Sequence, residues 1–481
     1  MRKIVLCMDG TGNEIGDTET NVLKFYRSLS QTNGQITHYI LGVGAYDRQS
    51  LYARPLQKIT GVLGLAFGLG LENDVLEAYR WLCRTYKSAG DHASDWKTAH
   101  PRSKTMPKFE NDRIYVMGFS RGSYAARVLA GFINNFGLVA ENDLHLVTAP
   151  FRAYRQINDL DKDEPANARF KALRQYGDIL RPVSVPIRAL CVFDTVASMI
   201  RLGWPWHNLI HHQSLFELST HANVSENPSV RIVVHAMAVD ERRSFFRVLP
   251  WDEGQCYFGS RFRREAAKRT QYLHQRWFPG YHSDIGGAEQ EDETGIGKIA
   301  ALWMLKTLEK AEQLADAEDN AVPQAGGGAT EAVFSAGLRL RAGHERVYFR
   351  GLPYGKFSTT NPGGYAYAGP DARAPLHNSV YRGWVPRWSW FWFGFEILIK
   401  SISRRETGPP AWFRRGLVWY LPFLEPRRIP DTHEVDDSVF IRRDDPACAY
   451  APENLNRPPP AEVSEWWNAP ADTANRPDFP A

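Results

Sequence analysis

The sequence predicts an α/β fold in which a mostly parallel sheet is flanked by helices. Strand-like apolar runs alternate with helix-like segments through residues 1–315, which is typical of β-α units. Some of these runs end directly in turns that contain Gly, Ser or Asp, the residues expected at the carboxyl edge of such a sheet. With 43% apolar and 23% charged residues, the chain has a globular composition. An aromatic-rich C-terminal portion follows the α/β region.

The first expected strand is residues 3–8 (K-I-V-L-C-M), and the sequence D-G-T-G-N follows it at once. An apolar strand followed by D-x-D-G-T also opens the haloacid-dehalogenase phosphatases. The nucleophilic aspartate of that motif corresponds here to Cys7. This departure removes phosphoaspartate chemistry, so we do not favour a phosphatase.

Residues 118–122 (G-F-S-R-G) are the most informative stretch, because they join a strand-like run, residues 113–117, to a helix-like run, residues 123–133. Strand, G-x-S-x-G and helix together are typical of a nucleophile elbow, with Ser120 at the tip of a tight turn. The alternative is an ordinary glycine-rich turn with no catalytic role. The flanking elements favour Ser120 as a nucleophile.

A nucleophilic serine needs an acid and a base, in the chain order Ser, Asp or Glu, His. The buried strand expected at residues 187–193 ends at Asp194, which would lie at the carboxyl edge of the sheet. Asp194 could instead be a helix cap or turn former, and Asp240 and Asp284 are rival acids. Asp284 is too close to the predicted base to come from a separate strand, so we expect it to support that loop.

The predicted base is His282, within the loop P-G-Y-H-S-D-I-G-G. Glycines on both sides give a backbone able to project its imidazole into a cleft. The chain has fourteen histidines. The rivals are His274, His211, His212 and His235.

An oxyanion hole would complete such a site, with one amide from the residue after the nucleophile and another from a loop after an early strand. Arg121 supplies the first. Gly10 or Thr11 supplies the second, because the glycine-rich loop after residues 3–8 exposes N–H groups.

Taken together, these motifs resemble the bacterial α/β-hydrolase family that includes type VI secretion phospholipase effectors of the first lipase class. The resemblance covers about residues 1–310, and the motifs taken in this order are more specific than any one of them. The motifs are residues 9–13, 20–22, 42–44, 118–122, 193–196, 240–243 and 278–287. It implies an α/β-hydrolase-like fold and a Ser-Asp-His triad of Ser120, Asp194 and His282 that cleaves acyl esters of glycerophospholipids. It also implies secretion-apparatus and immunity-protein partners.

Charge, cysteine content and apolar runs give little support to several other kinds of protein. A formal charge of +4 over 481 residues gives little support for nucleic-acid binding. The five cysteines have no close spacing, so neither a disulfide framework nor a zinc site is indicated. Asp9 interrupts the first apolar run too early for a signal peptide, and no apolar run is long enough to cross a bilayer. We therefore expect synthesis in the cytoplasm and no cofactor or metal, and, if the protein acts outside its cell, export by a route that needs no cleavable signal.

We divide the chain into a catalytic domain at residues 1–315, a glycine-rich linker or loop at 316–330, and an aromatic-rich portion at 331–481. This last portion completes the catalytic domain, forms a lid, or docks on a membrane. Trp388, Trp390 and Trp392 favour peripheral membrane contact, since Trp prefers the membrane interface. The alternative is a packed aromatic core.

The sequence predicts a serine hydrolase of acyl esters, most simply a phospholipase A-type lipase acting on membrane glycerophospholipids. Two alternatives stay open. One is a soluble esterase or thioesterase, and the other is a non-catalytic membrane-binding module on a hydrolase scaffold.

Overall fold

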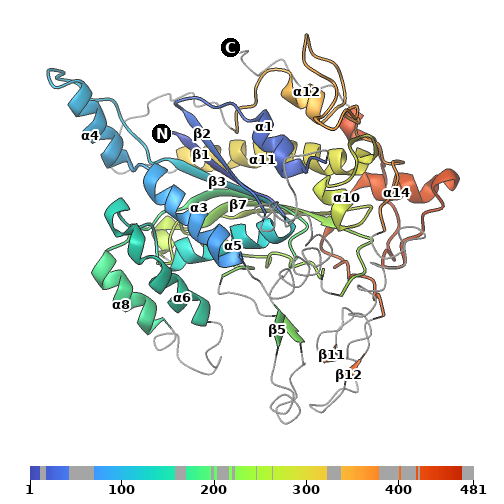
Figure 1. Ribbon diagram of the computed structural model, residues 1–481, viewed down its shortest axis with the longest axis horizontal. Coiled ribbons are helices and arrows are strands. Elements are labelled where there is room, and N and C mark those ends of the chain that lie inside the picture. The colour runs from blue at the N-terminus through green and yellow to red at the C-terminus, as the bar shows by residue number, and fades with distance from the viewer. Residues whose placement is uncertain are drawn as a thin grey trace, which may run out of the picture.

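The computed structural model describes residues 1–10, 18–42, 70–157, 170–196, 200–202, 216–218, 223–244, 246–262, 264–321, 337–378, 400–401, 419–420 and 423–468. Within this part of the chain a seven-stranded sheet has the order β13-β10-β7-β4-β3-β1-β2, and every neighbouring pair is parallel (Figure 1). Its strands are β1 (Lys3–Met8), β2 (Gln35–Ile40), β3 (Arg113–Phe119), β4 (Ile187–Phe193), β7 (Val230–Ala238), β10 (Tyr272–Phe278) and β13 (Glu434–Val435).

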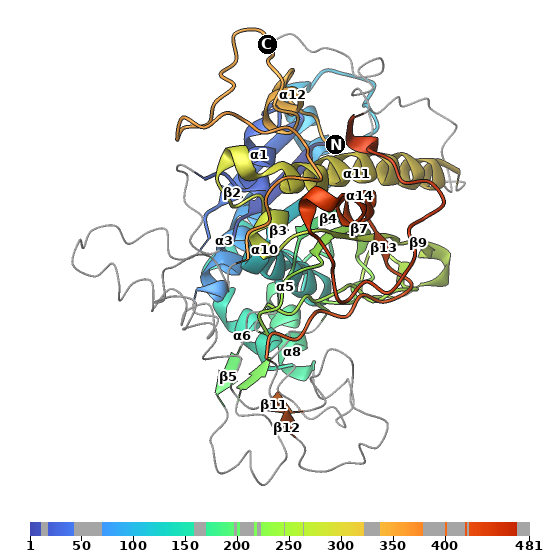
Figure 2. The ribbon, with the colours of Figure 1, turned by 90° about the vertical axis from the view of Figure 1, so that its right-hand side faces the viewer.

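Helices cover both faces of the sheet (Figures 1 and 2). On one face lie α3 (Leu71–Thr85) and α5 (Ser120–Asn135), and on the other lie α1 (Asn21–Ser28) and α11 (Gly295–Ala321). The central strands are apolar on both sides, because successive side chains point to opposite faces. In β1, for example, Leu6 packs with the α3 and α5 layer, whereas Val5 packs with the α1 and α11 layer.

Shorter elements surround this three-layer core. The helices are α4 (Ala89–Ala99), α6 (Thr148–Gln156), α8 (Lys171–Leu180), α10 (His282–Gly286), α12 (His344–Tyr348) and α14 (Asp437–Asp444). The short strand pairs are β5 (Ile200–Leu202) with β6 (Phe216–Leu218), β8 (Cys256–Tyr257) with β9 (Arg269–Thr270), and β11 (Lys400–Ser401) with β12 (Trp419–Tyr420). The 3-10 turns are Glu141–Leu146, Glu265–Ala267, Glu291–Glu293, Pro446–Cys448 and Trp466–Asn468.

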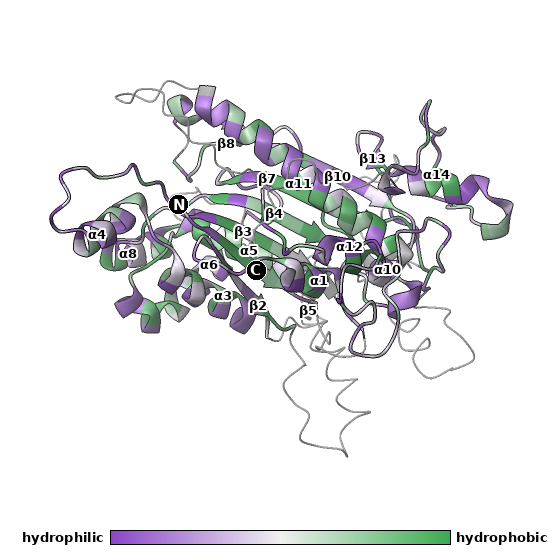
Figure 3. Cartoon of the chain, turned by 90° about the horizontal axis from the view of Figure 1, so that it is seen from above, coloured by the Kyte–Doolittle hydropathy of each residue, from purple (hydrophilic) through white to green (hydrophobic). Residues whose placement is uncertain are grey.

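The architecture confirms the predicted fold class, a mostly parallel sheet flanked by helices and similar to an α/β-hydrolase. In Figure 3 the strands are mainly hydrophobic, whereas the helices carry both hydrophobic and hydrophilic residues. No helix in the described ranges is long and apolar enough to span a bilayer.

The C-terminal part of the chain returns to the sheet. β13 adds to the edge beside β10, where Arg276 pairs with Glu434 and Trp277 with Val435. α11 continues to Ala321, so residues 316–321 of the expected linker are helical, while residues 322–330 lie outside the described ranges. Because β13 belongs to the same sheet, we propose that the catalytic unit includes residues 423–468.

Candidate active site

The parallel sheet brings the predicted site residues to one edge. Phe119, the last residue of β3, is paired with Phe193, the last residue of β4. Ser120 and Asp194, which follow them, therefore emerge from adjacent strand ends. β10 ends at Phe278, opposite Ala238 of β7, and His282 follows four residues later.

Ser120 begins α5 with a φ of 56°, a left-handed conformation that is costly for a residue with a side chain. Both glycines of the motif are required by close backbone packing. A Cβ on Gly118 would lie 2.8 Å from Ser123 Cα, and one on Gly122 would lie 2.2 Å from the Met8 carbonyl oxygen. The local sequence therefore allows the sharp turn that presents Oγ.

His282 connects the other two predicted residues. Its Nε2 lies 2.7 Å from Ser120 Oγ, and its Nδ1 lies 2.6 Å from Asp194 Oδ2. An ionised carboxylate only accepts, so Nδ1–H donates to Asp194 and Nε2 is left to accept the serine hydroxyl proton. This relay of hydrogen bonds suits general-base activation of a hydroxyl.

Aromatic rings and a buried ion pair hold His282, which is the first residue of the short helix α10 rather than part of the predicted loop. Phe119 stacks on the imidazole and Phe246 meets it edge-on, each with centroids 4.9 Å apart. Glu241 Oε2 accepts a long hydrogen bond of 3.4 Å from the His282 amide and is paired with Arg243 at 2.7 Å. Burial alone would raise the pKa of Glu241, but Arg243 lowers it to about 2, so this carboxylate stays ionised.

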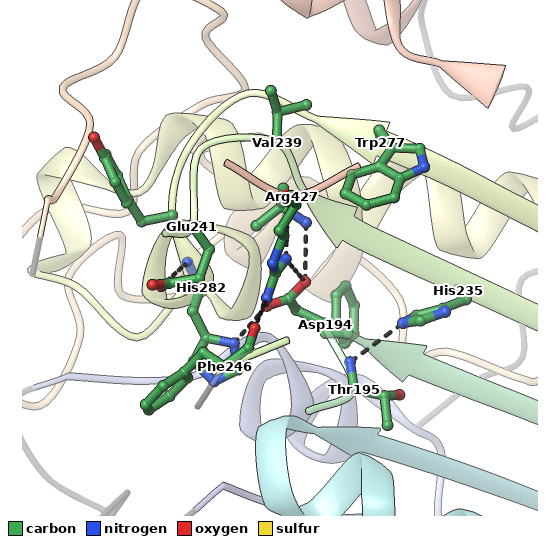
Figure 4. Close-up of polar contacts among 12 residues, drawn as sticks. Asp194, Thr195, His235, Val239, Glu241, Phe246, Trp277, His282 and Arg427 are labelled. Atoms are coloured by element: carbon green, nitrogen blue, oxygen red, sulfur yellow. Dashed lines mark hydrogen bonds and ion pairs between the residues drawn. The ribbon is translucent and has the colours of Figure 1, made fainter. Parts of the chain in front are cut away.

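Asp194 is fully buried and is held by an arginine from far along the chain (Figure 4). Arg427 Nη1 donates to Oδ1 at 2.7 Å, and Nη2 donates to Oδ2 at 3.0 Å. The Ala238 amide also donates to Oδ1, at 3.0 Å. Burial by itself would raise the pKa of Asp194, but Arg427 and the hydrogen bond with His282 lower it far below its usual range. The acid is therefore charged at neutral pH.

Of the three oxyanion-hole candidates, Arg121 lies next to Ser120, the Gly10 amide has another partner, and Thr11 is not described. Arg121 follows Ser120 in α5, where Gly122 contacts the end of β1. The Gly10 amide donates to Asp9 Oδ1 at 2.7 Å, so it would have to exchange this partner to bind a substrate oxyanion. Thr11 lies outside the described residues.

The rival histidines have other surroundings. His235 is buried, lies 3.2 Å from Arg127 Nη2, and accepts the Thr195 amide at its other nitrogen. His274 lies within β10, four residues before the end of the strand, and burial lowers its pKa. His211 and His212 lie outside the described residues.

The rival acids lie outside the relay and hold the backbone just before α10. Asp240 accepts hydrogen bonds from the Gly280 amide at 2.6 Å and from the Tyr450 hydroxyl at 2.9 Å. Burial raises its pKa to about 6. Asp284 accepts the Tyr281 amide at 2.8 Å and pairs with His377 Nδ1 at 2.6 Å.

The features that suggested a phosphatase have structural roles. Cys7 is completely buried inside β1, and burial raises the pKa of its thiol far above the usual range. Asp9 accepts hydrogen bonds from Thr20 at 2.5 Å and from Tyr39 at 2.6 Å, which fixes the loop after β1. Among the residues that the structure describes, no group of three or more His, Cys, Asp or Glu could hold a metal ion.

Trp388, Trp390 and Trp392, the predicted membrane-contact residues, lie outside the described ranges. Membrane contact through them stays a prediction.

Sequence reasoning missed Arg427 and gave no role to Glu241 or Phe246. Glu241 lies in the motif D-E-R-R, which contributed to the family resemblance, so the sequence did offer a reason to expect it near the site. Arg427 had none: it is one of two consecutive arginines in a proline-containing stretch.

Comparison with known proteins gives a family match over residues 2–307. The matching family is described as "T6SS, Phospholipase effector Tle1-like, catalytic domain". Among curated proteins, the uncharacterized protein YEL023C of Saccharomyces cerevisiae is 28% identical over 264 residues, covering 52% of this chain and 32% of that protein. The chain thus spans about a third of the length of this curated relative.

Two solved structures are also similar. A crystal structure of an uncharacterized protein from Pseudomonas aeruginosa is 17% identical with a TM-score of 0.30, and covers 63% of this chain and 45% of that chain. A structure titled as the Tle1 effector bound to the VgrG spike of the type 6 secretion system is 18% identical with a TM-score of 0.29, covering 59% and 50%.

Proposed function

The chain belongs to the family of Tle1-like phospholipase effector catalytic domains, and from this premise we propose that it is a serine hydrolase that cleaves acyl esters of membrane glycerophospholipids. The observation that carries the proposal is the continuous relay from Ser120 Oγ through His282 to Asp194. The strained elbow at Ser120 and the full burial of Asp194 support it.

The proposed reaction begins when Ser120 Oγ attacks the ester carbonyl carbon and His282 Nε2 takes the hydroxyl proton. Asp194 holds the imidazole in the required tautomer and stabilises its charged form. The tetrahedral oxyanion is bound by the Arg121 amide and by an amide of the loop at Gly10 or Thr11. Each such donor is worth about 3 kcal/mol in comparable sites.

Collapse of the tetrahedral intermediate breaks the ester C–O bond, and the leaving alkoxide oxygen takes the proton from His282 to become the hydroxyl of the lysophospholipid. This step leaves an acyl group on Ser120. Water then attacks the acyl-enzyme with His282 as base, which releases the fatty acid and restores the serine hydroxyl. Apart from the attacking water, the groups that act in these steps are side chains and backbone amides of the chain.

We further propose that the protein is a type VI secretion effector, with a secretion-apparatus partner and an immunity protein. The support is family membership. Cytoplasmic synthesis and signal-independent export belong to the same proposal.

The test is to incubate the purified protein with phosphatidylglycerol and phosphatidylethanolamine vesicles and, separately, with a short p-nitrophenyl ester. We expect fatty acid release from vesicles and turnover of the ester. Ser120→Ala and His282→Ala should each lower turnover by roughly 10⁴-fold or more, because the residues act as a unit. His274→Ala is the matched control and should retain activity, since His274 lies away from the relay.

The outcomes separate the candidate functions. Turnover of the short ester without action on vesicles would favour a soluble esterase or thioesterase. Vesicle binding without hydrolysis would favour a non-catalytic module. Full activity in Ser120→Ala protein would exclude the mechanism.

A further inference from the structure

Arg427 binds both oxygens of the Asp194 carboxylate. Because His282 Nδ1 also donates to Oδ2, and the Ala238 amide also donates to Oδ1, each oxygen accepts from a guanidinium nitrogen and from one further donor. A guanidinium and a carboxylate bound at two points lie in fixed relative orientation. Rotation of the carboxylate would therefore break contacts with Arg427 and His282 together.

Arg427 is itself fixed on several sides. Its side chain is 2% exposed, its Nη1 donates to the Ala238 carbonyl oxygen at 2.9 Å, and its Nη2 donates to the Phe246 carbonyl oxygen. Its own carbonyl oxygen accepts from Asn454 Nδ2 at 2.9 Å, and the same nitrogen donates to the Val239 carbonyl oxygen at 3.0 Å. Figure 4 shows the Arg427 guanidinium beside the Asp194 carboxylate, joined to it by dashed lines.

A buried carboxylate at this place needs a partner. Asp194 is fully buried and has a φ of 39°, so both its charge and its backbone conformation have to be stabilised by the surroundings. Arg427 meets the first need. The positive charge of Arg427 offsets part of the negative charge that Asp194 presents to His282. Arg427 therefore helps by orienting the carboxylate, and it does not strengthen the negative charge.

We propose that Arg427 is a positioning residue for the predicted catalytic acid, holding Asp194 so that Oδ2 accepts the His282 Nδ1–H bond. This inference rests on the proposed function and deepens it. Arg427 lies 233 positions after Asp194 and beyond residues 2–307, which match the family. The reaction therefore depends on a segment outside the matched region.

The test compares Arg427→Gln, Arg427→Lys and the matched control Arg428→Gln, each measured for kcat and KM with a short p-nitrophenyl ester. Arg428 is the next residue and is exposed. Arg427→Gln should lower kcat by roughly 10- to 100-fold with little change in KM, as expected for a misplaced catalytic group. Arg427→Lys should fall between Arg427→Gln and the unaltered protein, because one ammonium cannot replace both contacts. Arg428→Gln should match the unaltered protein.

The decisive comparison repeats Arg427→Gln in an Asp194→Asn background. A residue that acts through Asp194 should cause less than about a twofold further loss there, since coupled residues are not additive. An equal loss in both backgrounds would overturn the proposal and assign Arg427 a structural role elsewhere. If Arg427→Gln does not fold, Arg427→Lys carries the comparison, and undiminished kcat in that variant overturns the proposal.

A fluorophosphonate probe that labels activated serines keeps the two proposals apart. If the unaltered protein neither reacts with the probe at Ser120 nor hydrolyses esters, the proposed function fails, and the role of Arg427 fails with it. If the unaltered protein reacts and Arg427→Gln reacts at the same rate, only the inference about Arg427 is wrong.

Discussion

Replacing Gly122 with alanine tests whether the contact between α5 and the end of β1 positions the site. A Cβ at this glycine would lie 2.2 Å from the Met8 carbonyl oxygen and 2.5 Å from that of Asp9. Ordinary contacts begin at 3.4 Å, so the start of α5 would have to move by about 1.2 Å away from β1. Both neighbours are backbone atoms of a buried strand end, so they cannot rotate aside as a flexible side chain can.

The displacement separates the Arg121 amide from the loop at Gly10, the two sides of the predicted oxyanion hole. A misplacement of about 1 Å can reduce the rate roughly 100-fold, which equals about 2.7 kcal/mol of transition-state stabilisation. This is similar to the loss of one oxyanion donor. The overpacked contact should also lower the free energy of unfolding by about 1 to 3 kcal/mol.

The assay is kcat/KM for a p-nitrophenyl ester, with the melting temperature measured on the same preparation. Gly177→Ala in α8 is the matched control, because nothing lies within 4 Å of its added Cβ. It should leave activity unchanged and stabilise the helix by about 0.5 to 1 kcal/mol. A folded Gly122→Ala protein with kcat/KM within about threefold of the unaltered protein would refute the reasoning.

Three further predictions concern other parts of the molecule. Cys7→Ser should leave ester hydrolysis largely intact and yield no magnesium-dependent phosphatase activity; release of phosphate from a generic phosphate ester would revive the phosphatase alternative. Burial alone would lower the pKa of His377, but its hydrogen bonds to Asp284 and Glu293 raise it to about 9, so the charged pair should stabilise the fold fully below about pH 6.5 and lose this effect as pH rises through 9. Urea unfolding at pH 6, 8 and 10 should then show the deficit of His377→Gln shrinking with pH, and a constant deficit would contradict this. Replacing Trp390 and Trp392 together with alanine should weaken vesicle binding by more than about tenfold and spare the short ester; equal loss on both substrates with a lower melting temperature would indicate core rings.

The fold class followed from local pattern because each strand and helix carries its own periodicity. The apolar runs at residues 3–8, 113–117 and 187–193 indicated strands of a sheet covered by helices, and the structure has them as neighbouring strands of a parallel sheet, the second extended to Phe119. α11 continues to Ala321, so its last turn falls within the glycine-rich linker or loop expected at residues 316–330, and the domain division itself stays a prediction.

The sequence by itself determined the elbow at Ser120 and the chain order of Ser120, Asp194 and His282, because glycine spacing and strand ends are local properties. The tertiary structure decided which of several acids and histidines approach the serine, since this depends on strand order and register. It alone introduced Arg427, which reaches Asp194 only because the chain folds back along the sheet edge after residue 423. Local sequence encodes backbone conformation, but the partner of a buried charge is set by which distant segments the fold brings together.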